Sequence, residues 1–98
     1  MINDNMAMCI VNQTCESLDL ASIAEELLTF EDVDASFVIG KLSNDLIGIS
    51  SRSLGNIDVS IIMNKLGGGG HSSNAAAQIK DKSLKEVKQE IIDLIKAI

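Results

Sequence analysis

The residues best suited to bind an anion lie in two short stretches of this 98-residue chain. Residues 67–71 read Gly-Gly-Gly-Gly-His and contain the only histidine, His71. Glycine lacks a side chain, so consecutive glycines leave backbone N–H groups that a phosphate or the edge of an adenine can approach closely. Four glycines also cost folding entropy, so we weigh this binding role equally with that of a flexible hinge. The run consists of Gly67, Gly68, Gly69 and Gly70.

The second stretch, Ser50–Ser53, carries the only arginine, Arg52. A planar guanidinium group holds a phosphate through paired hydrogen bonds better than a lysine does. Side chains alternate between the two faces of a strand, so Ser50 and Arg52 share one face. The apolar Ile47 and Ile49 share the opposite face. We therefore expect Arg52 to point away from the core, and we favour an anion site over an arginine that is merely solvated at the surface.

His71 suits the role of hydrogen-bond donor to a phosphate oxygen, and the alternative is a structural histidine. No aspartate or cysteine stands beside it at the spacing of a catalytic triad, and the scattered carboxylates form no recognisable set of metal ligands. The glycine run lacks the Lys-Ser or Lys-Thr ending of a Walker loop. It also follows a predicted helix, whereas a dinucleotide-binding GxGxxG loop follows a strand. The pattern therefore predicts an anion contact without catalysis or metal binding.

Composition narrows the class of partner. A chain of this length forms one domain. Its formal net charge of −6 disfavours long polyanions, which bind through many lysines and arginines, and the two aromatic residues offer little for stacking bases. Cys9 and Cys15 match no metal or redox spacing, so we expect free thiols and a reducing, cytoplasmic location. We find no apolar run of about 20 residues that could span a bilayer, and no signal peptide.

Hydrophobic periodicity predicts alternating strands and helices. The apolar and β-branched runs predict strands at residues 7–12, 35–42, 46–53 and 75–79. The middle two strands are expected to form a hairpin around the polar turn at residues 43–45. The predicted fold is a single small α/β domain, with a central mixed sheet of about four strands flanked by helices.

Three helices are expected from apolar residues at helical spacing. The first has the stripe Leu20, Ile23, Ala24, Leu27 and Leu28, with Asp19 as its N-cap. The second has the stripe Val59, Ile62, Met63 and Leu66, between a cap at Asp58 and a left-handed stop at Gly67. The last begins at a capping box formed by Ser83 and Glu86, and its stripe is Leu84, Val87, Ile91, Leu94, Ile95 and Ile98.

Three motifs follow one another in this chain: Ser-Ser-Arg-Ser at residues 50–53, Asp58 in Asn-Ile-Asp-Val, and the segment from the glycine run through the alanines at 67–77. In this order they resemble the C-terminal, DHH-associated domain of the DHH phosphoesterase superfamily, over nearly the whole chain. In having Asn74 before the alanines, the motif resembles that of the GdpP-like cyclic-di-AMP phosphodiesterases of Firmicutes. RecJ-like exonucleases and oligoribonucleases carry a glycine where this chain has Ala77, which weakens the resemblance to that branch.

The resemblance implies a division of labour. In the family, a neighbouring DHH domain holds two Mn ions and hydrolyses the phosphodiester, while the DHH-associated domain closes over the cleft and grips the substrate. Carried over by position, Arg52 contacts a phosphate or base, two serines support it, the glycines offer backbone and His71 donates to a phosphate. The substrate-binding residues implied in this way are Ser50, Arg52, Ser53, Gly67, Gly68, Gly69, Gly70, His71 and Asn74.

The implied partners are a cyclic dinucleotide or short oligonucleotide and the DHH domain of the same polypeptide. The full-length protein is expected to be membrane-anchored, with this domain on the cytoplasmic side and without membrane contact of its own. Residues 1–98 contain no Asp-His-His tripeptide and no cluster able to hold two metals, so we expect this chain alone to be inactive. Two alternatives stay open: a nucleic-acid-binding module of a RecJ-like nuclease, and a structural domain that forms a homodimer through its last helix.

Overall fold

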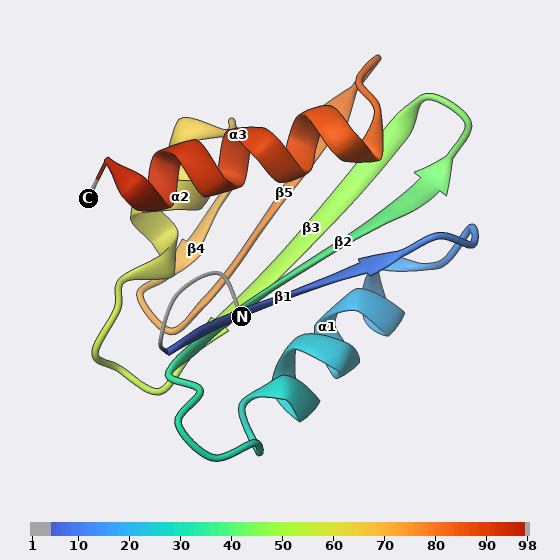
Figure 1. Cartoon of the computed structure of the whole chain (residues 1–98). Coiled ribbons are helices and arrows are strands. Elements are labelled where there is room, and N and C mark those ends of the chain that lie inside the picture. The colour runs from blue at the N-terminus through green and yellow to red at the C-terminus, as the bar shows by residue number, and fades with distance from the viewer. Residues whose placement is uncertain (1–4, 98) are drawn as a thin grey trace.

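The structure, a computed structural model, describes residues 5–97 and consists of a five-stranded sheet with helices on both faces (Figure 1). The elements in chain order are β1 (Met6–Val11), α1 (Ser17–Leu27), β2 (Ala35–Ser43), β3 (Leu46–Ser53), α2 (Val59–Lys65), β4 (Gly69–His71), β5 (Asn74–Lys80) and α3 (Leu84–Lys96). The predicted strands, the hairpin and the three helices are confirmed, as is the α/β fold class.

The sheet has the strand order β1-β2-β3-β5-β4. β1 and β2 are parallel and are joined through α1, whereas the other neighbouring strands are antiparallel. In Figure 1, α2 and α3 lie on one side of the sheet and α1 lies on the other. The two faces of the sheet are therefore covered by different amounts of helix.

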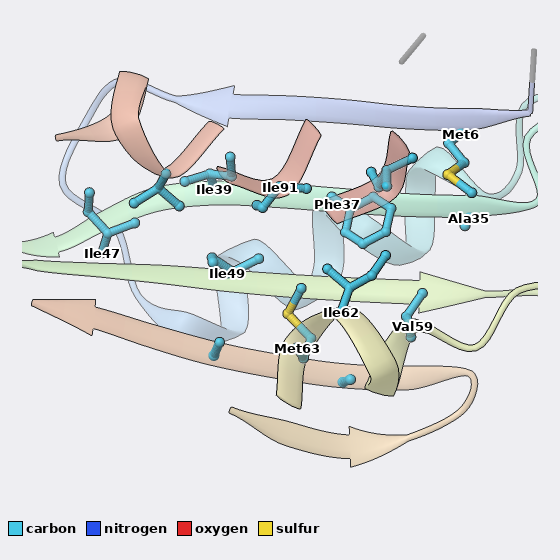
Figure 2. Packing of buried hydrophobic residues seen from close by; sticks show 14 residues of the cluster. Met6, Ala35, Phe37, Ile39, Ile47, Ile49, Val59, Ile62, Met63 and Ile91 are labelled. Carbon is cyan, nitrogen blue, oxygen red and sulfur yellow. The ribbon is translucent and has the colours of Figure 1, made fainter. Parts of the chain in front are cut away.

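The main hydrophobic core lies between the sheet and the pair α2 and α3 (Figure 2). Phe37, from the middle of the sheet, is fully buried there, and Ile62 of α2 and Ile91 of α3 belong to the same cluster. The predicted stripe of the last helix belongs to this core at Val87, Ile91 and Ile95. Because those side chains are already covered within the chain, the stripe is not a free surface for a second copy. Ile98 lies outside the described residues.

On the opposite face, α1 covers only part of the sheet. It packs on β2 and β3, where Leu20, Ala24 and Val38 form a second, smaller cluster. The buried Ser36 hydroxyl donates to the Ala24 carbonyl at 2.7 Å, which satisfies a polar group between α1 and β2. The β5 residues on this side are exposed. They are Asn74, Ala76, Gln78 and Lys80.

The helix ends follow the predicted capping chemistry with one correction. The Asp58 side chain accepts a hydrogen bond from the Ser60 amide at 3.0 Å, and Ser83 forms the expected capping box with Glu86. The prediction that Asp19 is the cap of α1 is wrong. The N-cap is Glu16, and Asp19 is the third residue of the helix, from which its carboxylate accepts a hydrogen bond from the Glu16 amide at 2.9 Å. A carboxylate accepts hydrogen bonds from backbone amides, so an acidic side chain can serve at the N-cap or at the third helical position of a capping box.

The fifth strand, which the sequence analysis did not predict, lies within the glycine run. β4 pairs with β5 through the partners Gly69 and Ala76, Gly70 and Ala75, and His71 and Asn74. Such a close approach to β5 requires glycine at two positions. A Cβ on Gly68 would lie 2.1 Å from the Ala76 carbonyl oxygen, and one on Gly70, where φ is +142°, would lie 2.5 Å from the Asn74 carbonyl oxygen. The glycines therefore have a packing role that composition did not reveal.

Candidate functional site

Arg52, Asn74 and His71 form a row across three neighbouring strands. Arg52 is the direct partner of Asn74 between β3 and β5, and His71 is the direct partner of Asn74 between β4 and β5. Directly paired residues of antiparallel strands point to the same face of a sheet. The sheet therefore brings together three of the predicted site residues that are up to 22 positions apart in the sequence. We call Arg52, Asn74 and His71 the polar row.

The Arg52 side chain is held in a defined place, with only 13% of its surface exposed. Its Nη1 donates to the Ser50 hydroxyl at 3.3 Å and to the Ser51 carbonyl at 3.0 Å. Its Nε lies 3.6 Å from the carboxylate of Glu25 in α1, a side chain that is 69% exposed. An ion pair with so exposed a partner is screened by water and contributes little to stability. The guanidinium is thus oriented by the protein and paired with a carboxylate that can move away.

The prediction that Arg52 faces away from the core is confirmed. Ile47 and Ile49 belong to the main core under α2 and α3, whereas Arg52 contacts Glu25 of α1 on the opposite face. Ser50 lies beside Arg52 and accepts its hydrogen bond, as expected for a supporting residue. Ser53 is not brought to Arg52. As the next residue along the strand it points to the other face, and its hydroxyl accepts a hydrogen bond from the Gly55 amide at 3.0 Å.

An open pocket of about 520 Å³ lies beside the polar row, between α1 and the exposed part of β5. It is lined by Ser17, Leu18, Leu20, Ala21, Gly48, Ile49, Ser50, Arg52, Gly67, Gly68, Asn74, Ala76, Ala77 and Gln78. Of these, only Arg52 carries a charge, so the pocket has a cationic end in a protein whose net charge is −6. Its volume is in the range of sites for small molecules. His71 lies outside this lining and is exposed.

The glycine run contributes less free backbone than predicted. The Gly67 amide donates to the Asn64 carbonyl at 3.1 Å and the Gly68 amide to the Met63 carbonyl at 2.8 Å, which closes the end of α2. The prediction of free amide donors is therefore wrong for these two residues. Gly67 has φ of +87° and is the left-handed stop predicted for the helix. Both glycines still line the pocket.

The hairpin tip between β4 and β5 is held on both sides. The Ser72 carbonyl accepts a hydrogen bond from the Val59 amide at 3.0 Å, which ties the tip to the first residue of α2. The Ser73 carbonyl accepts one from the Ser53 amide, also at 3.0 Å, which ties it to the end of β3. The residues on either side of this tip are His71 and Asn74, so the polar row is fixed to the ends of two other elements.

The two cysteines are free thiols, as predicted. Cys15 is partly buried, and its Sγ donates to the Lys41 carbonyl at 3.6 Å. Burial raises the pKa of the Cys15 thiol, and the nearby Asp19 carboxylate raises it further. A raised pKa means less of the reactive thiolate at neutral pH. Cys15 is therefore a poor candidate for a nucleophile.

Among residues 5–97, no group of three or more histidine, cysteine, aspartate or glutamate side chains is placed to hold a metal ion. None of the helices formed by these residues has the length and apolar character needed to cross a membrane.

Comparison with known proteins places this chain in a family. The model of the DHHA1 domain matches residues 3–98, so the chain belongs to the DHHA1 domain family. The cyclic-di-AMP phosphodiesterase PdeA of Listeria monocytogenes is 46% identical over 97 residues, which cover 97% of this chain and 15% of that protein. The cyclic-di-AMP phosphodiesterase GdpP of Geobacillus thermodenitrificans is 45% identical over 84 residues, which cover 86% of this chain and 13% of that protein. The chain thus spans about one seventh of the length of these relatives.

A solved structure supports the fold independently. The C-Ala domain of alanyl-tRNA synthetase from Aquifex aeolicus aligns with a TM-score of 0.75 over 94% of both chains, at 15% sequence identity. At that identity the likeness concerns the fold alone. The resemblance to the DHH-associated domain of cyclic-di-AMP phosphodiesterases is confirmed by the family match and by the sequence relatives.

Sequence reasoning missed several residues of the site region, among them Leu18, Glu25 and Gln78. Leu18 and Glu25 come from α1, and no local pattern indicates that this helix borders β3. Gln78 could have been found from the sequence, because side-chain alternation along β5 places it on the same face as Asn74 and Ala76.

Proposed function

We propose that this domain binds the substrate of a cyclic-di-AMP phosphodiesterase, gripping the nucleotide through Arg52 and the glycine-run hairpin. The observation that carries the proposal is the polar row beside an open pocket with one cationic residue. The sequence relatives, which are named as cyclic-di-AMP phosphodiesterases, supply the class of ligand.

Arg52 is the principal phosphate contact in this proposal. A guanidinium that is mostly buried and held by two hydrogen bonds loses little side-chain entropy when it binds an anion. A phosphate displaces the exposed Glu25 carboxylate and binds the Arg52 guanidinium in its place. Asn74 and His71 add further hydrogen-bond donors along the same row. In the described residues, neither side chain has a hydrogen-bond partner that would compete with the ligand.

The bond-breaking step is assigned to a DHH domain outside these residues, which the family resemblance provides with two Mn ions. The role of this chain is to hold the nucleotide against that domain. Membrane attachment of the full-length protein, with this domain on the cytoplasmic side, belongs to the same proposal and depends on segments outside these 98 residues.

An NMR amide titration with cyclic-di-AMP tests the binding role. We expect shifts confined to Ser50–Ser53 and to residues 67–74, and at least a tenfold loss of affinity in Arg52→Ala, since charge-assisted hydrogen bonds contribute about 1.5–3 kcal/mol. Lys85→Ala, which removes an exposed cation from α3 on the other face, is the matched control and should bind as the wild type does. Equal binding by both variants would contradict the proposal.

A hydrolysis assay tests the division of labour. The purified chain, incubated with cyclic-di-AMP and Mn²⁺, should release product no faster than Mn²⁺ alone. A rate above the metal-only control would show that this domain is itself catalytic. Binding of oligoribonucleotides with a steep dependence on salt, in place of cyclic-di-AMP binding, would favour the nucleic-acid alternative.

A further inference from the structure

We infer that the pocket beside Arg52 binds the nucleobase of the same ligand, with Gln78 selecting adenine and Leu18 forming an apolar wall. This inference rests on the proposed function, because the position of the base is inferred from a phosphate bound at Arg52. It adds a base contact at Gln78 and Leu18, two residues that none of the three sequence motifs includes.

The floor of the pocket suits a flat guest. It is lined by small residues of the neighbouring strands β3 and β5, of which Gly48 and Ser50 are buried and Ala76 is exposed. The space above Gly48 is occupied by the side chains of Leu42 and Leu20, which would lie 2.8 Å and 3.0 Å from a Cβ added there, so the open part of the floor lies at the exposed Ala76. The small side chain of Ala76, together with the exposed Leu18 of α1, leaves room for a planar ring to lie against this part of the sheet.

Leu18 supplies an apolar surface at this slot. It lies in the first turn of α1, lines the pocket and is 77% exposed, more than any other large hydrophobic residue in the described part of the chain. Covering an exposed leucine removes apolar area from water and is favourable. Because neither phenylalanine lines the pocket, the base would contact aliphatic groups and backbone instead of stacking on an aromatic ring.

Gln78 lies at a suitable distance from the phosphate end. It pairs with Gly48, four cross-strand pairs along from the pair of Asn74 and Arg52. Four residues of strand correspond to about 13 Å. Phosphate and base edge are at opposite ends of a nucleotide, and the Arg52 and Gln78 side chains extend the reach from both ends. A nucleoside monophosphate can therefore engage both groups.

The chemistry of Gln78 favours adenine. Its carboxamide has one acceptor and two donor hydrogens, and it makes no hydrogen bond with another described residue. A carboxamide forms a paired contact with the amino group and ring nitrogen N7 of adenine. Guanine presents two acceptors on the same edge, so one half of the contact is lost.

Titrations with AMP, GMP and ribose 5-phosphate test the base site, because the last ligand has a phosphate but no base. We expect AMP to bind the chain more tightly than either of the others. Gln78→Ala should weaken AMP about three- to tenfold, the range for one or two hydrogen bonds, and leave ribose 5-phosphate unchanged. Leu18→Ala should weaken AMP and GMP alike. Gln89→Ala, which removes a glutamine from α3 on the other face, should change nothing.

The outcomes separate the two proposals. If AMP and ribose 5-phosphate bind equally while Arg52→Ala weakens both, the phosphate grip stands and the base site is wrong. If Gln78→Ala leaves the preference for AMP over GMP intact, Gln78 does not select the base. If Arg52→Ala affects none of the ligands, the proposed function fails and the base site fails with it. Gln78 and Leu18 are exposed, so their variants should fold, which the dispersion of the amide spectrum checks.

Discussion

The two faces of this sheet are formed by the same strands but differ in which residues they carry and in how fully helices cover them. The face under α2 and α3 is filled by aliphatic residues and Phe37 and contains most of the buried core. The face under α1 has a small cluster near β2, and beyond it an open area with glycine, alanine, serine and amide side chains around one arginine. The main hydrophobic core and the candidate site thus lie on opposite faces of one sheet. Substitutions on the two faces should have different kinds of effect.

The largest effect should come from the covered face. Ile91→Ala removes a fully buried side chain of α3 and should lower the free energy of unfolding by about 2–5 kcal/mol. Leu18→Ala, the counterpart on the open face, should change it by no more than about 0.5 kcal/mol, because little of its surface is buried. Urea unfolding followed by circular dichroism measures both. Similar losses in the two variants would contradict the separation.

A smaller effect is expected within the glycine run, where two neighbours differ. Gly68→Ala places a Cβ against the backbone of β5 and should cost about 1–3 kcal/mol. At Gly69 the nearest atom to an added Cβ is the Asn64 Oδ1 at 3.4 Å, so Gly69→Ala should be neutral or stabilise the fold by less than about 1 kcal/mol. If both variants are equally stable, the run is a loose hinge and its close packing on β5 has been overstated.

The exposed ion pair should have a measurable influence on ligand affinity. Glu25→Gln removes the carboxylate that competes for Arg52, and we expect cyclic-di-AMP to bind about two- to threefold more tightly. Glu26→Gln, an adjacent exposed carboxylate without an ion pair to Arg52, is the control. Weaker binding in Glu25→Gln would mean that the glutamate orients the arginine for the ligand.

The smallest effect concerns Cys15. Burial and the Asp19 carboxylate both raise its pKa, so at a given pH less thiolate is present and alkylation is slowed. Asp19→Asn removes the negative charge, which should lower the pKa and make alkylation by iodoacetamide modestly faster at pH 8. The rate is measured in a Cys9→Ser background, so that only one thiol reacts. An unchanged rate would show that burial alone controls this thiol.

Much of the fold was predictable because its elements have strong local patterns. The capping box at Ser83 and the β-branched hairpin are local signals, and both are confirmed. β4 was not predictable, because glycine has low strand propensity and its pairing depends on the alanines of β5. The face of Arg52 followed from alternation, whereas its contact with Glu25 depends on how α1 crosses the sheet. That crossing is a tertiary property which no short stretch specifies.

The tethered hairpin tip has a consequence for the thermodynamics of recognition. Because the Ser72 and Ser73 carbonyls are tied to Val59 and Ser53, the loop cannot open without breaking hydrogen bonds to two other elements. A ligand therefore meets groups that are already in place and does not have to order a mobile loop, which lowers the entropic cost of binding. The amides of Val59 and Ser53 should exchange slowly with solvent even in the absence of nucleotide. Hydrogen exchange at these two positions thus measures how rigid the site is before any substrate arrives.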